Sequence, residues 1–196
     1  MERHVDGREI VEVGDRASWR RWLAERHEQR ESIWLVFHKQ ASNGSSPTYD
    51  EAVEEALCFG WIDSTVNKLD ENRSLQLFAP RRPRGTWSAS NKERVARLER
   101  EGLLAPAGIA AIELAKESGT WTALDAVERL EEPPELAGAL DANAAAREQW
   151  NGFSPSSRKA ILWWVVSAKR PETRARRVER TVRMAAKGLR AQIDSE

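Results

Sequence analysis

Apolar and polar positions change their spacing repeatedly along the first eighty residues of the chain. Short runs rich in β-branched and aromatic residues predict four strands, at residues 9–13, 32–39, 61–66 and 73–79. Apolar residues recur at helical spacing over residues 15–27 and 48–60, and these two segments are expected to form helices. The first eighty residues therefore predict the order β-α-β-α-β-β.

Residues that favour helix ends define the two predicted helices. Asp15 is expected to cap the first. Thr48 and Glu51 have the spacing of a capping box, and Gly60 is expected to end the second helix. Its apolar face is expected to contain four residues: Tyr49, Val53, Ala56 and Leu57.

The remainder of the chain has mainly helical patterns. A capping box is expected at Ser90 and Glu93, with helix ends at Gly102 and Gly119. One or two short helices are expected in residues 120–153, and further helices follow Ser154 and Pro171. We therefore expect an α+β fold: a small mixed β-sheet with helices in residues 1–87, and a helical region in residues 88–196 that packs on the sheet as one unit.

The last two helices differ in their patterns. The segment 160–166 has no charged residue, so its helix should be largely buried, with Trp163 or Trp164 nearly inaccessible. The last helix is amphipathic. One face contains Ala175, Val178, Val182, Ala186 and Leu189, and is expected to dock on the protein. The opposite face contains Arg176, Arg180, Arg183 and Lys187, and is expected to be exposed.

Charge is balanced overall but segregated along the chain. The 31 basic and 31 acidic residues give a net charge of zero, so no global field attracts nucleic acid or membranes. Residues 101–153 are strongly acidic, whereas residues 80–100 and 154–190 are basic. These blocks can pair within the fold or across a dimer, or they can offer a basic face to a polyanion. The oligomeric state does not follow from the pattern.

The remaining composition narrows the class of protein. A single Cys cannot form an intramolecular disulfide, and the three His show no metal-ligand spacing, so neither a metal nor a cofactor is expected. The first twenty residues lack an apolar signal-peptide core, and no apolar run is long enough to span a membrane. A cytoplasmic location is therefore expected.

One segment concentrates residues suited to binding an anion. Arg81 and Arg82 lie in a Pro- and Gly-rich loop that leads into a predicted helix. Guanidinium groups and helix N-termini both favour carboxylates and phosphates, and Trp provides an apolar wall. We expect the two ends of the 61–79 hairpin to bring a pocket together, formed by Trp61, Asp63, Arg81, Arg82, Trp87, Ser88 and Asn91.

Other interpretations of these residues stay open. Asp63 can pair with an arginine of the 81–84 loop in a purely structural role, or it can act as a base in an enzyme that uses a small phosphorylated or carboxylated substrate. Cys58 is expected to be a buried thiol, although a Cys58–His38 pair is conceivable. No catalytic residue can be assigned.

The basic last helix suggests another function. A basic helix after the turn at residues 169–171 resembles the second helix of a helix-turn-helix, which would make the protein a binder of nucleic acid or of an anionic surface. The zero net charge argues against this, and a small anionic ligand is the preferred partner.

Three blocks of sequence resemble the YdeI or OmpD-associated family, also described as bacteriocin-protection. They are residues 51–64 (EAVEEALCFGWIDS), residues 80–94 with PRRP, Trp87-Ser88, Asn91 and Arg94, and residues 168–174 (AKRPETR). The resemblance implies a bacterial protein connected with tolerance of bacteriocins or antimicrobial peptides. It implies no catalytic residues.

Overall fold

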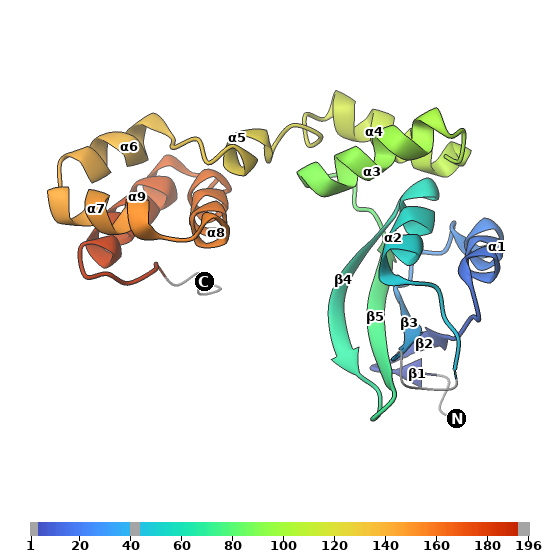
Figure 1. The fold of residues 1–196 in the computed structure, drawn as a ribbon. Helices are drawn as coiled ribbons and strands as arrows, with labels where there is room; N and C mark the ends of the chain where they lie inside the picture. Colours follow the sequence, from blue (N-terminus) through green and yellow to red (C-terminus); the bar gives the residue numbers. More distant parts are fainter. Residues whose placement is uncertain (1–3, 40–43, 192–196) are drawn as a thin grey trace. The chain divides into compact units, whose positions relative to one another are not determined.

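A computed structural model of the protein describes residues 4–39 and 44–191, and their contacts divide the chain into two compact units. The first extends to Thr122 and the second begins at Ala123. The first contains a mixed sheet with flanking helices, and the second is helical (Figure 1). The predicted α+β class is confirmed.

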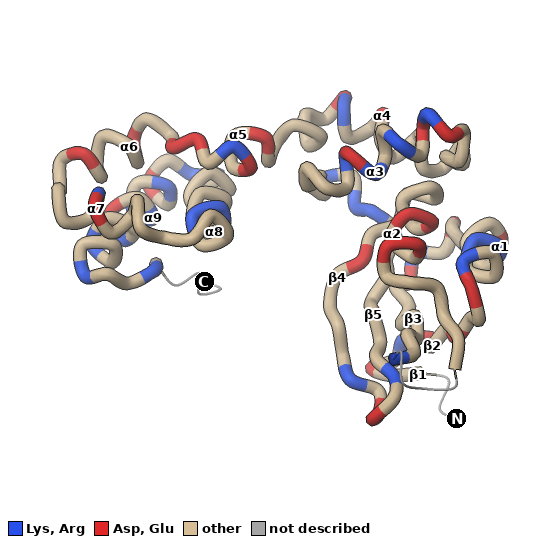
Figure 2. Tube along the Cα trace, in the orientation of Figure 1, with Lys and Arg blue, Asp and Glu red and all other residues tan. Residues whose placement is uncertain are grey.

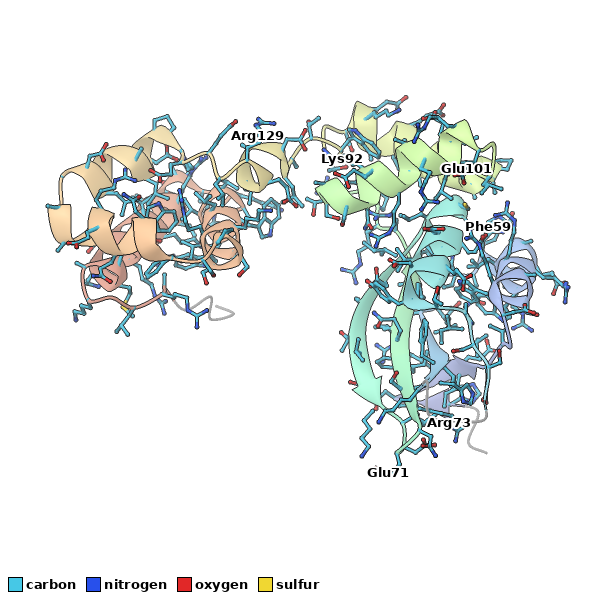
Figure 3. The ribbon with its side chains drawn as sticks, viewed as in Figure 1. Phe59, Glu71, Arg73, Lys92, Glu101 and Arg129 are labelled. Carbon is cyan, nitrogen blue, oxygen red and sulfur yellow. The ribbon has the colours of Figure 1, made fainter. Side chains whose placement is uncertain are left out.

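A five-stranded sheet is the frame of the first unit, with the order β1-β2-β3-β5-β4. Its strands are β1 (His4–Val5), β2 (Arg8–Val11), β3 (Ile33–His38), β4 (Trp61–Lys68) and β5 (Arg73–Pro80). Only β2 and β3 run parallel, and the other neighbours are antiparallel. The β4–β5 hairpin has a register shift between Asp63 and Val66. Figure 3 shows Glu71 and Arg73 at its tip.

Two helices cover one face of this sheet (Figure 1). Helix α1 (Arg16–Arg26) is capped by Asp15, and α2 (Tyr49–Cys58) begins with the predicted Thr48–Glu51 capping box. Trp19 and Leu23 of α1 pack with Val53 and Leu57 of α2 in the main core. Tyr49, also on the predicted apolar face of α2, is 48% exposed, because it lies in the first turn of the helix, outside the core.

Helices α3 (Ala89–Arg100) and α4 (Pro106–Glu117) complete the first unit. The cap of α3 is Ser88 rather than the predicted Ser90, because the Ser88 hydroxyl accepts the backbone N–H of Asn91. Helix α4 begins against the C-terminal end of α2, where Cys58 O accepts from Ala105 N at 3.0 Å. A Cβ on Gly108 would lie only 2.2 Å from that carbonyl oxygen, so this approach requires glycine.

The boundary between the two units, at residues 122 and 123, lies well beyond the predicted boundary at residue 87. Helices α2 and α3 pack together, as do α2 and α4. The segment 88–122 is therefore part of the sheet-containing unit, although its sequence is as helical as the rest of the second half.

The second unit packs five short helices around their own core: α5 (Asp125–Glu128), α6 (Pro134–Asp141), α7 (Ala144–Gly152), α8 (Pro155–Val166) and α9 (Pro171–Ala185). Leu136, Trp150 and Leu162 are fully buried there. Glu132 joins several elements. Its carboxylate accepts from Trp150 Nε1 at 2.7 Å and from Arg147 Nη1 at 2.8 Å.

The expectations for α8 and α9 are confirmed in part. Trp164 is 7% exposed and belongs to the core of the second unit, whereas Trp163 is 37% exposed and lies outside that core. Val178 docks in the core, but Leu189 is 52% exposed beyond the end of α9, and Ala175 is exposed near its start. The predicted docking stripe is therefore too long at both ends.

Among the described residues, no helix has the length and apolar character needed to cross a membrane.

Candidate functional site

The ends of the β4–β5 hairpin meet beside the N-terminus of α3. Trp61 pairs with Pro80 in the sheet, and Arg81 N donates to Gly60 O at 2.9 Å. Gly60 has a φ of +75°, a conformation that glycine adopts readily and that turns the chain from α2 into β4. The start of β4 and the end of β5 therefore lie side by side, and loop 81–88 begins next to them.

Arg81 is the centre of the candidate site. Its Cζ lies 3.4 Å from the centroid of the Trp87 ring, so the guanidinium stacks on the indole. Nη1 donates to Thr86 O at 3.3 Å. Nε and Nη2 are inaccessible and have no hydrogen-bond partner among the described residues. Burial lowers the pKa of Arg81 to about 10, and the nearby charge of Asp63 opposes this shift. Arg81 is therefore still a cation at neutral pH.

Asp63 is engaged by neutral donors. Its Oδ2 accepts from Tyr49 Oη at 2.8 Å and from Gln76 Nε2 at 3.2 Å. Burial, together with the hydrogen bond to this carboxylate, raises the pKa of Tyr49 to about 12. Among the described residues, Asp63 acts on Arg81 through its charge, without a hydrogen bond between the two side chains.

Ser88 and Asn91 lie at the first turn of α3. Ser88 caps the helix, and Asn91 Oδ1 accepts from Arg94 Nη1 at 3.3 Å. Arg94 also bonds Asp50 at 2.7 Å, which ties α3 to the start of α2. The structure therefore places Asp63, Arg81 and Trp87 together, with Ser88 and Asn91 following directly in the chain.

Two of the predicted residues make other contacts, and among the described residues neither has a side-chain hydrogen bond to Asp63, Arg81 or Trp87. Trp61 is fully buried, its Nε1 donates to His27 O at 3.0 Å, and its ring meets Trp22 edge-on. Arg82 is exposed, and its carbonyl closes a turn with Gly85 N at 2.8 Å.

Tyr49, Gln76 and Asp50 are neighbours that the sequence did not reveal. Tyr49 lies on a different helix from the predicted residues, and only the docking of α2 on β4 brings its hydroxyl to Asp63. The strand pattern could have indicated Gln76, because it is a polar residue at a buried position of a strand, and such a residue needs a hydrogen-bonding partner.

A second polar cluster lies inside the first unit. Glu55 is 2% exposed, and its carboxylate accepts from Arg16 Nε and Arg20 Nη1, each at 2.6 Å. Glu54 pairs with Arg16 and Arg97. Figure 2 shows the acidic residues along α2 and basic residues on the neighbouring α1. These ion pairs join α2 to α1 and α3, so we assign them a structural role.

Cys58 ends α2 in this region. Burial, together with the charge of Glu55, raises the pKa of its thiol. The conceivable Cys58–His38 pair is wrong, because His38 Nε2 lies 2.9 Å from Glu12 Oε1 at the end of β3, and Cys58 has Arg20 as a neighbour. No group of His, Cys, Asp and Glu that could hold a metal ion occurs within residues 4–39 and 44–191.

Two family models match the chain, one within each of the two compact units. Residues 11–111, more than half of the chain, match the model described as "Domain of unknown function (DUF8412)". The chain belongs to this family. Residues 129–188 match the model described as "Bacteriocin-protection, YdeI or OmpD-Associated". No curated protein and no solved structure matches the chain.

The second match confirms the resemblance and shows where it lies. Of the three blocks that suggested it, only residues 168–174 fall within the bacteriocin-protection match. The blocks at 51–64 and 80–94 fall within the DUF8412 match. The candidate site is thus a feature of the DUF8412 domain of this chain, and helices α6 to α9 make up most of the bacteriocin-protection part.

Proposed function

We propose that the protein is a bacterial anion-binding protein that acts in tolerance of bacteriocins or antimicrobial peptides. The observation that carries the anion-binding part is Arg81. Its guanidinium is largely desolvated and stacked on Trp87, and its Nε and Nη2 have no hydrogen-bond partner among the described residues. A buried charge without a paired counter-charge is costly, and a bound anion would offset that cost.

The surroundings of Arg81 support the same ligand class. The N-terminus of α3, a helix of twelve residues, begins directly after Trp87 and contributes positive potential. Residues 82–84 are exposed and residues 85 and 86 half-buried. An anion can approach Arg81 if this loop segment moves, with the Arg81–Trp87 stack as a preformed platform.

The tolerance role rests on the description of the family that residues 129–188 match. A cytoplasmic location is part of the same proposal, and cell fractionation tests it.

The geometry at Asp63 supports the enzyme alternative less well than it supports the binding proposal. A base at Asp63 needs a lone pair directed at a substrate proton. Its Oδ2 already accepts hydrogen bonds from Tyr49 and Gln76, so this oxygen is not free to accept a substrate proton. We therefore expect binding without turnover.

Calorimetric titration with inorganic phosphate and with citrate tests the binding proposal. Arg81→Gln should abolish binding at this site, whereas the exposed Arg84→Gln, in the same loop, should retain it. Equal losses in the two variants would show a diffuse charge effect, and no binding by the wild type would exclude the site. Arg81→Gln in a bacterial host deleted for this gene then tests whether binding and bacteriocin tolerance are linked.

A further inference from the structure

One edge of the Arg81 guanidinium has no hydrogen-bond partner. Its Nε and Nη2 are inaccessible to solvent and have no partner among the described residues, whereas Nη1 donates to Thr86 O at 3.3 Å. In a guanidinium, Nε and Nη2 share one edge of the plane, and one N–H bond of each points in the same direction. Arg81 therefore has two parallel, buried donors that are directed at the same place.

This edge matches a carboxylate in shape. A carboxylate has two oxygens in one plane, and each can accept from one of two parallel N–H groups. Trp87 covers one face of the guanidinium, with Arg81 Cζ 3.4 Å from the centroid of the indole ring. A coplanar carboxylate would lie beside this stack, whereas a tetrahedral anion has oxygens above and below the plane. The stack therefore favours a planar ligand group over a tetrahedral one.

Asp63 limits the charge of the ligand. Burial lowers the pKa of Arg81, and the negative charge of Asp63 opposes this shift, so the two charged groups interact. Tyr49 and Gln76 hold the Asp63 carboxylate through hydrogen bonds of 2.8 and 3.2 Å, and both donors are neutral. They fix the position of the carboxylate without cancelling its charge. An anion bound at Arg81 is therefore attracted by Arg81 and repelled by Asp63.

These charges favour a monoanion over a dianion. The attraction of a second negative charge to Arg81 is offset by its repulsion from Asp63, and a dianion also loses more hydration on binding. The N-terminus of α3 adds only about half a positive charge. Arg82 and Arg84 are exposed, so solvent and salt screen their contribution. A carboxylate carries one negative charge, whereas a phosphate group carries between about 1.5 and 2 at neutral pH.

The surroundings of the two donors also restrict the size of the ligand. The loop of residues 82–86 leaves Arg81 and returns to it through Thr86 O, and residues 82–84 are exposed. Because the free donors are inaccessible, a ligand reaches them when this loop moves, and a small ligand allows the loop to close again. We propose that Arg81 binds the carboxylate of a small organic acid in preference to a phosphate. This preference rests on the anion site proposed above and names the ligand class of that site.

The Arg81 Nε–H signal in NMR spectra of the 15N-labelled full chain tests the preference. The signal is assigned by its loss in Arg81→Gln, and acetate, acetamide and sulfate are titrated at ionic strength held constant with sodium chloride. Acetate should shift the signal in a saturable manner, because Nε then donates to a carboxylate oxygen. Acetamide has nearly the same shape without the charge, and sulfate is a tetrahedral dianion, so each should cause a much smaller shift at the same concentration.

Three variants, compared by calorimetric titration, separate carboxylate recognition from a general effect of charge. Arg81→Lys keeps the charge but removes the two parallel donors, and it should weaken acetate binding at least about ten-fold. Arg84→Gln, a change in the exposed part of the same loop, should leave acetate binding unchanged. Asp63→Asn removes the repulsion and should bring the affinity for sulfate closer to that for acetate.

The possible failures are distinguishable. Sulfate binding as tightly as acetate would overturn the carboxylate preference but leave the anion site at Arg81 standing. No shift of the Arg81 signal with acetate or sulfate would overturn both. The preference would also be overturned by equal effects of acetamide and acetate, by unchanged acetate binding in Arg81→Lys, by an equal loss in Arg84→Gln, or by an unchanged preference in Asp63→Asn.

Circular dichroism and thermal melting establish that each variant is folded. Should Arg81→Gln not fold, Arg81→Lys also lacks the guanidinium Nε–H and assigns the signal in its place. The comparison of acetate, acetamide and sulfate in the wild type depends on neither variant for its result, because a single arginine signal that responds to acetate in preference to sulfate is lost or retained with Arg81.

Discussion

The hydroxyl of Tyr49 donates a 2.8 Å hydrogen bond to Oδ2 of Asp63 and so joins the first turn of α2 to β4. Tyr49 is the single tyrosine of the chain, so its ionisation can be followed by tyrosinate absorbance without interference from another tyrosine. We expect a native pKa of about 12, raised from the ordinary value of 10.0 by burial and by the Asp63 carboxylate.

Asp63→Asn should lower the pKa of Tyr49, because the amide lacks the negative charge, whereas Asp141→Asn in the second unit should not change it. Because the folded-state pKa is raised, the stabilisation from this group is complete below about pH 10 and is lost as the pH rises toward 12. Arg81 acts oppositely, since its lowered pKa makes unfolding bind protons at high pH. The two effects on stability oppose each other at high pH, so the pKa of Tyr49 is measured by tyrosinate absorbance and not by overall stability. A Tyr49 pKa near 10 in the folded wild type would contradict the hydrogen bond.

Gly108→Ala should destabilise the first unit. The new methyl group would meet Cys58 O at 2.2 Å, so α4 must shift, at a cost of about 1–3 kcal/mol as in other overpacked sites. Gly138 provides a matched control, because it also lies in a helix but has open space around its Cβ position. Gly138→Ala should stabilise the protein by about 0.5–1 kcal/mol. Denaturant unfolding measures both, and equal effects would argue against the close α2–α4 contact.

Glu55→Gln should cost about 3 kcal/mol of unfolding free energy, because it removes the negative charge that Arg16 and Arg20 share in a buried position. Glu71→Gln, on the exposed hairpin tip, removes an ion pair with Lys68 and should cost less than about 1 kcal/mol. Chemical denaturation compares the two. A cost for Glu55→Gln as small as that of Glu71→Gln would show that solvent already screens the buried cluster.

Trp164→Ala should cost about 3–5 kcal/mol, as expected for a buried aromatic side chain, whereas Trp163→Ala should cost much less because that ring is partly in solvent. The two residues are adjacent on α8, so helix propensity changes equally in both variants. Thermal unfolding provides the comparison, and wild-type stability of Trp164→Ala would refute the packing of α8 against α9.

The sequence by itself determined features that depend on neighbours in the chain. Asp15 and Thr48 cap their helices as predicted, because a cap is made with backbone groups three residues away. The strands at β3, β4 and β5 and the α+β class followed from periodicity and turn residues for the same reason.

Only the tertiary structure decided which distant groups meet. The hydrogen bond from Tyr49 to Asp63 and the stacking of Arg177 and Arg180 on Trp164 depend on how helices dock, and docking is set by the shape of the packed core. The assignment of residues 88–122 to the sheet-containing unit also required it. Gly108 is the clearest example: any side chain at this position would collide with the carbonyl oxygen of Cys58, fifty residues earlier. A contact between residues so far apart in the chain cannot be read from the local sequence pattern.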